Sequence, residues 1–334
     1  MKQPDRGTVL VTGGTGFVGS HLVELLLARG YAVTCLVRDR SRLRWLAGMQ
    51  VRLVAGDCSD PDSLAGAVRD AAVVYHAAGL TKAFQKSDYY AVNQQGTRNI
   101  LEACGRHAPG LRKFVFVSSL AAAGPSRAGI PVTDRDEPHP VSDYGKSKLL
   151  AEDEVHRFKD RFPVVIMRPS AVYGPRDTDV FELFKWAAKG FILDLRGAER
   201  SMQWCYVGDV AEALLLAGER AVPSGSMYFA AEDRIYTATE FHRLLQVTGG
   251  VSAKVIKVPV WAGYAIGALS EVVGAIRGRA NIMNRQKVRE AVQQAWTCDL
   301  AKTAQDLGFK AGVSLEQGLE RTWTWYREQR WIRS

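Results

Sequence analysis

The stretch Val9-Leu-Val-Thr-Gly-Gly-Thr-Gly-Phe-Val-Gly19 decides the fold of this chain. A β-branched apolar run, a glycine turn and the amphipathic segment Phe17–Arg29 follow one another, which predicts a strand, a tight turn and a helix. Glycine suits the turn because the backbone must bend sharply and approach a pyrophosphate, to which the helix N-terminus offers free N–H groups. This order predicts a dinucleotide-binding loop rather than an ordinary strand–helix turn.

The same alternation continues through the first half of the chain. The predicted strands are Thr8–Thr12, Ala32–Val37, Val51–Ala55, Ala72–Tyr75, Lys113–Ser118 and Val164–Arg168. The predicted helices between them are Phe17–Arg29, Pro61–Arg69, Val92–His107 and Ser142–Phe162. Strands this apolar are buried on both faces, and helices between them imply right-handed crossovers. We therefore predict an α/β fold with a Rossmann-type, doubly wound parallel sheet.

After about residue 175 the rhythm changes, and seven of the eight tryptophans lie beyond residue 180. The helices expected there are Val180–Lys189, Val210–Glu219, Ala238–Val247 and Ser314–Arg327, with strands such as Ser226–Ala230 and Ala253–Val258. We expect residues 1–175 to form the dinucleotide-binding domain, with some later segments returning to it. Residues 176–334 are expected to form a smaller, mixed α/β substrate-binding lobe.

Composition narrows the class of protein. The 334 residues include 44 Lys and Arg against 35 Asp and Glu, a net charge of +9, and 47% are hydrophobic, which is ordinary for a globular chain. The five cysteines are scattered without metal-ligand spacing, and the polar N-terminus does not resemble a signal peptide. We therefore expect a reduced, cytoplasmic protein without a metal site. The charges form no long basic run and no nucleic-acid motif accompanies them, so no nucleic acid is expected.

The end of the second strand bears on the choice of dinucleotide. A carboxylate there would bind a ribose 2′-OH and select NAD, whereas an arginine suits a 2′-phosphate. Val37 is followed by Arg38, which favours NADP, and Arg40 or Arg42 is a candidate to assist it. Asp39 lies one or two positions late and leaves NAD open.

Two further signals carry chemistry. Tyr144-Gly-Lys-Ser-Lys148 places a phenol and an ammonium on one helix face, where the lysine lowers the pKa of the phenol for general acid–base work. The predicted strand Lys113–Ser118 ends in the hydroxyls of Ser118 and Ser119. Ligands bind at the carboxyl ends of such strands, so a serine there is placed to hydrogen-bond the reacting oxygen.

With these pieces in order, the chain resembles the extended short-chain dehydrogenase/reductase family over essentially its whole length. The matching segments are Thr12–Gly19, Gly56-Asp57, His76-Ala-Ala-Gly79, Asn93 with Gly96-Thr97, Ser118-Ser119, Tyr144 with Lys148, Arg168-Pro169, Tyr173-Gly-Pro175 and Tyr206-Val-Gly-Asp209. The resemblance implies Ser119, Tyr144 and Lys148 as catalytic residues, since the family's serine precedes its tyrosine by about 25 positions. Asn93 matches the family's helix asparagine, with a structural role at least as well supported as a catalytic one.

The resemblance also implies a set of cofactor-binding residues. Asp57 and its neighbour Cys58 are expected at the adenine, and the backbone of Ala77–Gly79 is expected to line the cofactor. The full expected set is Gly13, Thr15, Gly16, Phe17, Val18, Gly19, Arg38, Asp57, Cys58, Ala77, Ala78, Gly79, Tyr144, Lys148 and Pro169.

The family contains nucleotide-sugar epimerases and dehydratases, and also reductases of apolar alcohols and ketones such as the dihydroflavonol reductase and 3β-hydroxysteroid dehydrogenase groups. Three polar groups typical of the sugar enzymes are replaced here, by Val37-Arg38, by Ala171 and by Met202, although Arg200 is close to the last. Each lost contact costs about 1–3 kcal/mol. We therefore predict hydride transfer with an apolar alcohol or ketone. A nucleotide-sugar epimerase or dehydratase with tightly held NAD is the alternative, and a non-catalytic dinucleotide sensor is a third.

Three expectations concern surfaces. The apolar segment Val258–Ile276 is a mobile lid, a peripheral membrane contact or a core helix. Five aromatic residues are candidates for a pocket wall or for the lobe's core: Phe181, Trp186, Trp204, Trp261 and Tyr264. The family resemblance implies a homodimer formed through Val92–His107 and Ser142–Phe162.

Overall fold

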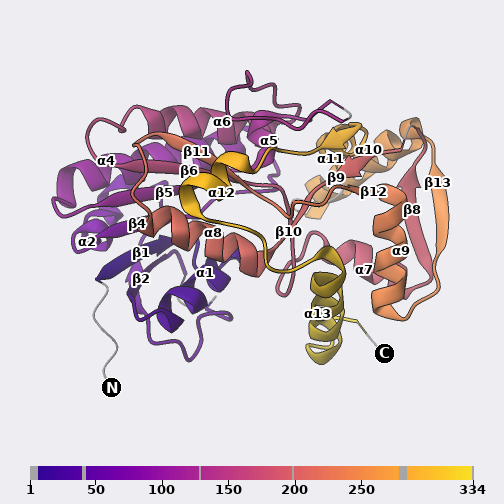
Figure 1. The fold of residues 1–334 in the computed structure, drawn as a ribbon, viewed down its shortest axis with the longest axis horizontal. Helices are drawn as coiled ribbons and strands as arrows, with labels where there is room; N and C mark the ends of the chain where they lie inside the picture. Colours follow the sequence, from indigo (N-terminus) through magenta and orange to yellow (C-terminus); the bar gives the residue numbers. More distant parts are fainter. Residues whose placement is uncertain (1–6, 40–42, 128, 198, 278–283, 333–334) are drawn as a thin grey trace.

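The computed structural model describes residues 7–39, 43–127, 129–197, 199–277 and 284–332. Its centre is a seven-stranded sheet in the order β11-β6-β5-β4-β1-β2-β3, and every pairing in it is parallel (Figure 1). Its strands are β1 (Thr8–Thr12), β2 (Ala32–Val37), β3 (Arg52–Ala55), β4 (Val73–His76), β5 (Lys113–Val117), β6 (Val164–Pro169) and β11 (Ser226–Ala230). The predicted α/β fold with a doubly wound parallel sheet is confirmed.

Helices cover both faces of this sheet. On one face pack α1 (Phe17–Ala28) and α8 (Val207–Glu219), and on the other α2 (Ala65–Val68), α4 (Gly96–His107) and α6 (Asp143–His156). Alternate residues of a strand point to opposite faces, so Val9 and Val11 join one core cluster while Leu10 joins the other. The chain order reverses between β1 and β4, and the loops after these two strands meet there.

Two predicted helices differ from the observed ones. The helix expected over Pro61–Arg69 is a 3-10 turn, η1 (Pro61–Ser63), followed by the single turn of α2. Its first turn is tightened because the Ser63 hydroxyl donates to the carbonyl of Asp60 at 2.7 Å. The helix expected from Val92 begins earlier, with α3 (Lys86–Tyr89) and a π-helical turn, η2 (Tyr90–Gln95), before α4. Such π turns often accompany functional sites, and this one carries Asn93.

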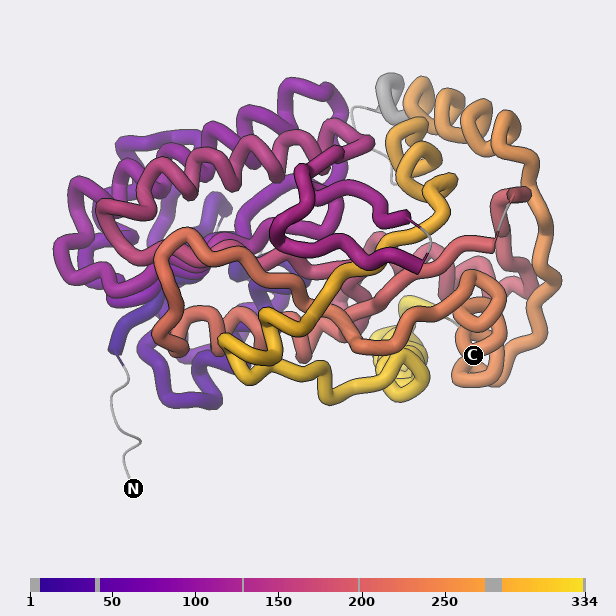
Figure 2. The backbone as a smooth tube through the Cα atoms, turned by 45° about the horizontal axis from the view of Figure 1, so that its top comes forward, coloured from indigo at the N-terminus to yellow at the C-terminus, as the bar shows by residue number. Residues whose placement is uncertain are grey.

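The remaining elements build a smaller C-terminal lobe around their own apolar cluster, apart from the short α5 (Leu120–Ala123) and α12 (Ala301–Leu307). Its strands are β7 (Ala171–Tyr173), β8 (Phe191–Leu195), β9 (Ser201–Met202), β10 (Trp204–Tyr206), β12 (Tyr236–Thr237), β13 (Lys254–Val258) and β14 (Ala295–Trp296). Its helices are α7 (Phe181–Ala188), α9 (Ala238–Gly249), α10 (Val260–Arg277), α11 (Arg285–Ala291) and α13 (Leu315–Glu328). Figure 2 shows the chain passing from this lobe back to the sheet and out again.

Aromatic residues mostly fill the core of this lobe. Trp204 is buried and stacks on Phe241 with ring centroids 4.4 Å apart, while Phe181 packs against Tyr326 at 4.8 Å. Both are therefore core residues rather than pocket walls. Trp186 and Trp261 are exposed, the latter by 74%. In the part of the chain that the structure describes, no helix combines the length and apolar character needed to cross a membrane.

Helix α10 is neither a simple core helix nor a free segment. Gly263 and Gly267 let it approach α11 closely, since a Cβ on Gly263 would lie 3.4 Å from Val288 and one on Gly267 only 2.9 Å from the backbone nitrogen of Arg285. Its opposite face is apolar and exposed, and consists of Trp261, Ile266, Leu269 and Val272. The core-helix interpretation thus holds for one face only.

Candidate active site

The glycine loop forms a tight cradle between β1 and α1. Gly13 has a positive φ of 71°, and a Cβ there would lie 2.6 Å from the backbone nitrogen of Ala78. A Cβ on Gly19 would lie 2.1 Å from the Gly13 carbonyl oxygen, so both positions exclude any side chain. Helix α1 begins at Phe17 without a side-chain N-cap, which leaves its first N–H groups for a ligand. This cradle fits a dinucleotide pyrophosphate.

A buried hydrogen-bond chain, which sequence reasoning missed, holds the loops after β1 and β4 together. His76 contacts Thr12 Oγ1 through Nδ1 at 2.6 Å and Thr97 Oγ1 through Nε2 at 3.0 Å. Thr97 donates to the Asn93 carbonyl at 2.5 Å, so it accepts from Nε2–H and leaves Nδ1 to accept from Thr12. Burial, aided by the nearby charge of Lys148, lowers the pKa of His76 to about 3. The imidazole is therefore a neutral bridge from the sheet to α4.

Arg38 and Asp57 come together at the ends of β2 and β3. The Arg38 Nε lies 4.0 Å from Asp57 Oδ2, and the Arg38 side chain is 70% exposed. Cys58 is buried, and its carbonyl accepts a hydrogen bond of 2.8 Å from the Asn99 amide. Arg40 and Arg42 lie outside the described residues. Three of the expected adenine-end residues thus adjoin one another, and Asn99 ties them to α4.

Ser119 and Tyr144 meet although they come from different elements. Ser119 caps α5 by accepting a hydrogen bond of 3.1 Å from the Ala121 N–H, and its hydroxyl is close enough to the Tyr144 phenol to act on its pKa. Burial raises the pKa of Tyr144, while the Ser119 hydroxyl and the charge of Lys287 oppose this rise. Glu290 and Tyr89 act in the same direction as burial. The arrangement suits a phenol that exchanges a proton with a neighbouring group.

Lys148 lies one helical turn after Tyr144, at the carboxyl end of β5. Its ammonium donates to the Val117 carbonyl at 2.6 Å and lies 4.1 Å from the centre of the Phe116 ring. Burial lowers the pKa of Lys148 to about 7, against the attraction of Glu152. A Cβ on Gly79 would lie 3.9 Å from Lys148 Nζ, so the ammonium faces the segment after β4.

Glu152 is a second residue that the sequence reasoning did not identify. Its carboxylate accepts two hydrogen bonds from buried Arg168, one from Nε at 2.9 Å and one from a terminal nitrogen at 2.6 Å. It also accepts a hydrogen bond from the Ser118 hydroxyl. This binds Ser118 into a structural network and leaves Ser119 for the phenol. Glu152 lies four residues after Lys148 on the same helix face, a spacing that would have indicated it.

Asn93 links the π-helical turn to the helix of Tyr144. Its Oδ1 accepts from the Leu80 N–H at 2.7 Å, and its amide donates to Ser147 Oγ at 2.9 Å. Ser147 in turn donates to the Tyr144 carbonyl at 2.8 Å. In this structure Asn93 therefore holds the Ala77–Leu80 segment against α6. Pro169 ends the buried strand β6 beside this region of the sheet.

The comparisons agree with this geometry. A family model described as the NAD dependent epimerase/dehydratase family matches residues 9–231. The chain belongs to this family. It is 33% identical to a ceramide reductase of Caulobacter vibrioides, over 99% of this chain and 98% of the relative. It is 34% identical to a 3 beta-hydroxysteroid dehydrogenase/Delta 5-->4-isomerase of Mycobacterium tuberculosis, over 71% and 68% of the two chains.

Solved structures of the epimerase/dehydratase family share the whole fold. A Thermus thermophilus UDP-glucose 4-epimerase in complex with NAD matches with a TM-score of 0.77 and 25% identity, covering 96% of this chain and 99% of that one. These findings confirm the predicted resemblance to extended short-chain dehydrogenases/reductases. The chain is an NAD(P)-dependent oxidoreductase of this family.

Arg200, two residues before Met202 in the chain, has partners within the C-terminal lobe. It contacts Asp194 and donates to the Leu195 carbonyl at 2.8 Å. Asp194 is buried and also binds Lys257. Arg200 is therefore committed to a structural ion pair, and Ala171, the first residue of β7, carries no polar side chain.

Of two surface hollows of about 320 and 550 Å³, the first is lined in part by Glu152 and Arg168. Lys302 and Asp134 line both of them, whereas neither Ser119 nor Tyr144 lines either. Among the described residues, no cluster of His, Cys, Asp and Glu is arranged to hold a metal ion.

Proposed function

We propose that the protein transfers a hydride between a nicotinamide dinucleotide and an apolar alcohol or ketone, as lipid- or sterol-like molecules carry. The observation that carries the proposal is the placement of the Ser119 hydroxyl beside the Tyr144 phenol, with Lys148 one turn away on α6. The loss of polar groups at Ala171 and Met202 and the engagement of Arg200 by Asp194 support an apolar substrate. Relatives named as a ceramide reductase and a hydroxysteroid dehydrogenase support the same class.

Each residue of the site has a distinct proposed role. When bound, the nicotinamide cofactor supplies or accepts the hydride. Ser119 orients the substrate oxygen, and Tyr144 donates a proton to that oxygen in reduction and removes it in oxidation. Lys148 stabilises the phenolate charge on Tyr144 and binds the cofactor ribose. The expected residues Gly13, Thr15, Gly16, Phe17, Val18 and Gly19 would hold the pyrophosphate, and Asp57, Cys58, Ala77, Ala78, Gly79 and Pro169 would line the remaining cofactor surface.

The exchange Tyr144→Phe tests this assignment. It removes the proton donor and leaves the glycine cradle intact, so turnover should fall by about 10²–10⁴-fold while calorimetric binding of NADP or NAD persists. The substrate for the assay comes from a thermal-shift screen of sterols, ceramide-like ketones, flavonoid-like ketones and nucleotide sugars. Ser118→Ala is the matched control, because Ser118 binds Glu152 rather than the phenol. Unchanged turnover in Tyr144→Phe would remove the proposed role.

A nucleotide-sugar epimerase or dehydratase is the second candidate, favoured by the shared fold with the Thermus epimerase. It predicts that the purified protein carries NAD that does not dissociate and gains heat stability with UDP- or dTDP-sugars. The apolar-substrate proposal predicts exchangeable cofactor and stabilisation by sterols or lipid ketones. One screen therefore separates the two candidates.

We propose NADP as the preferred cofactor, with Arg38 at its 2′-phosphate. We also propose that residues 1–175 form a cofactor domain and residues 176–334 a substrate lobe. We also propose a cytoplasmic homodimer. The exposed face of α10, with the neighbouring exposed Lys254, suits an anionic bilayer surface, from which an apolar substrate would be taken.

A further inference from the structure

Helix α11 of the C-terminal lobe is docked on the N-terminus of α6, the helix that carries Tyr144. The Ser142 hydroxyl donates to Glu290 Oε1 at 2.5 Å, and the Asp143 N–H donates to Gln286 Oε1 at 2.6 Å. The first N–H groups of a helix have no partner within it, so Gln286 supplies one from another part of the chain. Two side chains of α11 thus hold this helix against the two residues that precede Tyr144.

The same helix brings a second ammonium group to the phenol. Lys287 Nζ lies 5.8 Å from the centre of the Tyr144 ring and 2.9 Å from Glu290 Oε2. Its side chain is 38% exposed, and the ring of Tyr89 lies 6.3 Å from that of Tyr144. Glu290 therefore binds α6 with one carboxylate oxygen and Lys287 with the other, which fixes the ammonium beside the phenol.

The two lysines near Tyr144 differ in how firmly they keep their charge. Lys148 is fully enclosed, and burial lowers its pKa to about 7. Burial also disfavours the charge of Lys287, but the Glu290 carboxylate outweighs it and raises the pKa of Lys287. Near neutral pH, Lys287 is thus the lysine that stays fully protonated. The groups that act on the phenol are Ser119, which caps α5, Tyr89 from α3, and Lys287 and Glu290 from α11, while Lys148 lies one turn further along α6.

We propose that Lys287 is a positioning residue that stabilises the phenolate form of Tyr144, and that Glu290 holds it there by docking α11 on α6. This inference deepens the proposed function and rests on it, since it takes Tyr144 as the proton donor. The developing negative charge on Tyr144 then meets an ammonium from each lobe. Both ammonium groups are present near Tyr144 only when the C-terminal lobe is docked on α6.

Titration of the phenol tests the inference without any substrate. The ultraviolet difference spectrum between the protein and its Tyr144→Phe variant reports the ionisation of Tyr144 alone. Removing the cation with Lys287→Met should move this titration to higher pH, and Lys287→Arg should restore it. Glu290→Gln keeps an oxygen that accepts from Ser142 but loses the one that binds Lys287, so the ammonium is released from its place beside the phenol. In the Glu290→Gln background, Lys287→Met should therefore shift the titration less than it does in the unaltered protein. A merely structural role of Glu290 would leave that response unchanged.

Kinetics provide the second readout. The acid form of Tyr144 is needed for reduction, so the rate falls as pH rises through the pKa of the phenol. Lys287→Met should displace this falling limb to higher pH and lower turnover at neutral pH on the order of tenfold. Arg289→Met is the matched control, since it removes an exposed cation of the same helix that contacts the Val141 carbonyl and is not among the groups acting on the phenol.

The outcomes separate this inference from the proposed function. An unchanged Tyr144 titration in Lys287→Met, or equal shifts in Lys287→Met and Arg289→Met, overturns the inference even where Tyr144→Phe abolishes turnover. A shifted titration together with full turnover in Tyr144→Phe supports the contact of Lys287 with the phenol and refutes the role of the phenol as proton donor. Intact folding of each variant is checked by its thermal melt.

Discussion

Ser118 and Ser119 are neighbours in the chain, yet they have different partners. Successive side chains at the end of a strand point to opposite sides, so Ser118 reaches Glu152 under α6 and Ser119 reaches the phenol of Tyr144. A similar division applies to the two cations near the phenol. Lys148 is buried at the end of β5, whereas Lys287 is half-exposed and paired with Glu290. The proposed role of each serine and each lysine therefore follows from the group that its side chain contacts.

Arg38 is the residue on which cofactor preference is expected to depend. Arg38→Asp places a carboxylate at the end of β2, where it repels a 2′-phosphate and accepts from a ribose 2′-OH. We expect the affinity for NADP, relative to NAD, to fall about 10- to 100-fold, which calorimetry with both cofactors measures. Arg52→Asp on the neighbouring strand β3 is the control with the same change in charge. An unaltered ratio of the two affinities in Arg38→Asp would contradict the role.

At the scale of elements, the two faces of α10 have different surroundings. Small residues on one face let it pack against α11, and Glu271 on that side pairs with Arg285 at 2.8 Å. Trp261, Ile266, Leu269 and Val272 leave the other face apolar and exposed. The nearby pair of β8 and β13 adds exposed Phe191, Leu193, Val255 and Ile256 (Figure 1). An apolar surface of this kind beside lysines is typical of proteins that bind a bilayer interface.

A charged residue on this face tests the proposed membrane contact. Leu269→Glu should reduce co-sedimentation with vesicles containing phosphatidylserine by about tenfold or more, because a carboxylate then enters the interface and repels the anionic lipid. Exchange of exposed Ile130 for Glu, remote from α10 in the chain, is the control. Neutral phosphatidylcholine vesicles should bind less than anionic ones. Equal sedimentation of the protein with and without vesicles would contradict the contact.

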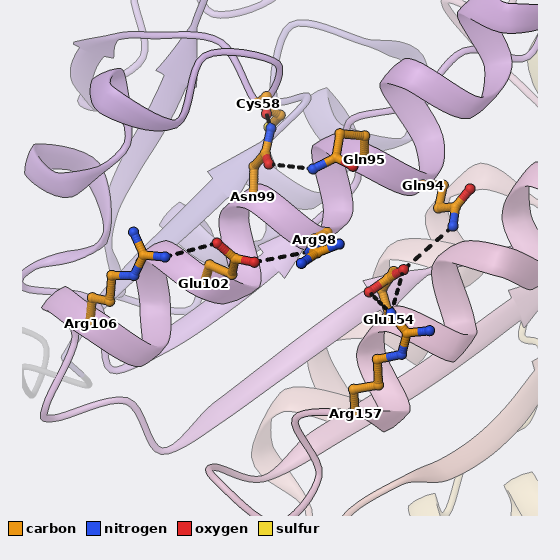
Figure 3. Close-up of polar contacts among 9 residues, drawn as sticks. All are labelled: Cys58, Gln94, Gln95, Arg98, Asn99, Glu102, Arg106, Glu154 and Arg157. Atoms are coloured by element: carbon orange, nitrogen blue, oxygen red, sulfur yellow. Dashed lines mark hydrogen bonds and ion pairs between the residues drawn. The ribbon is translucent and has the colours of Figure 1, made fainter.

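At the scale of the whole molecule, the outer surfaces of α4 and α6 are candidates for a dimer interface. Two of their charged clusters are paired within one protomer, with Glu102 between Arg98 and Arg106, and Glu154 between Arg157 and Gln94 (Figure 3). Burying these two clusters would therefore not leave their charges without partners, which is the main cost of a polar interface. Leu150 is exposed nearby and offers an apolar contact.

The mass in solution tests this arrangement. One chain has a mass of 36.8 kDa. Sedimentation equilibrium at micromolar concentration should give twice that mass. Glu102→Lys places three cations in a row on α4, so it should weaken dimerisation by about 1 kcal/mol or more in each protomer. Exchange of Lys302, which lies on α12, for Glu is the control with a reversed charge elsewhere. A monomeric mass for the unaltered protein would refute the dimer.

The sequence by itself determined the parallel sheet, the glycine cradle and the pairing of a tyrosine with a lysine on one helix face. These depend on local periodicity and short spacing, which a single segment displays. The His76 chain, the binding of Ser118 by Glu152 and the approach of Lys287 to Tyr144 were decided only by the tertiary structure. Lys287 lies in another lobe and on a separate helix, and no local pattern specifies where that helix docks. The buried contacts between the two lobes set that position, and with it the charge around the phenol.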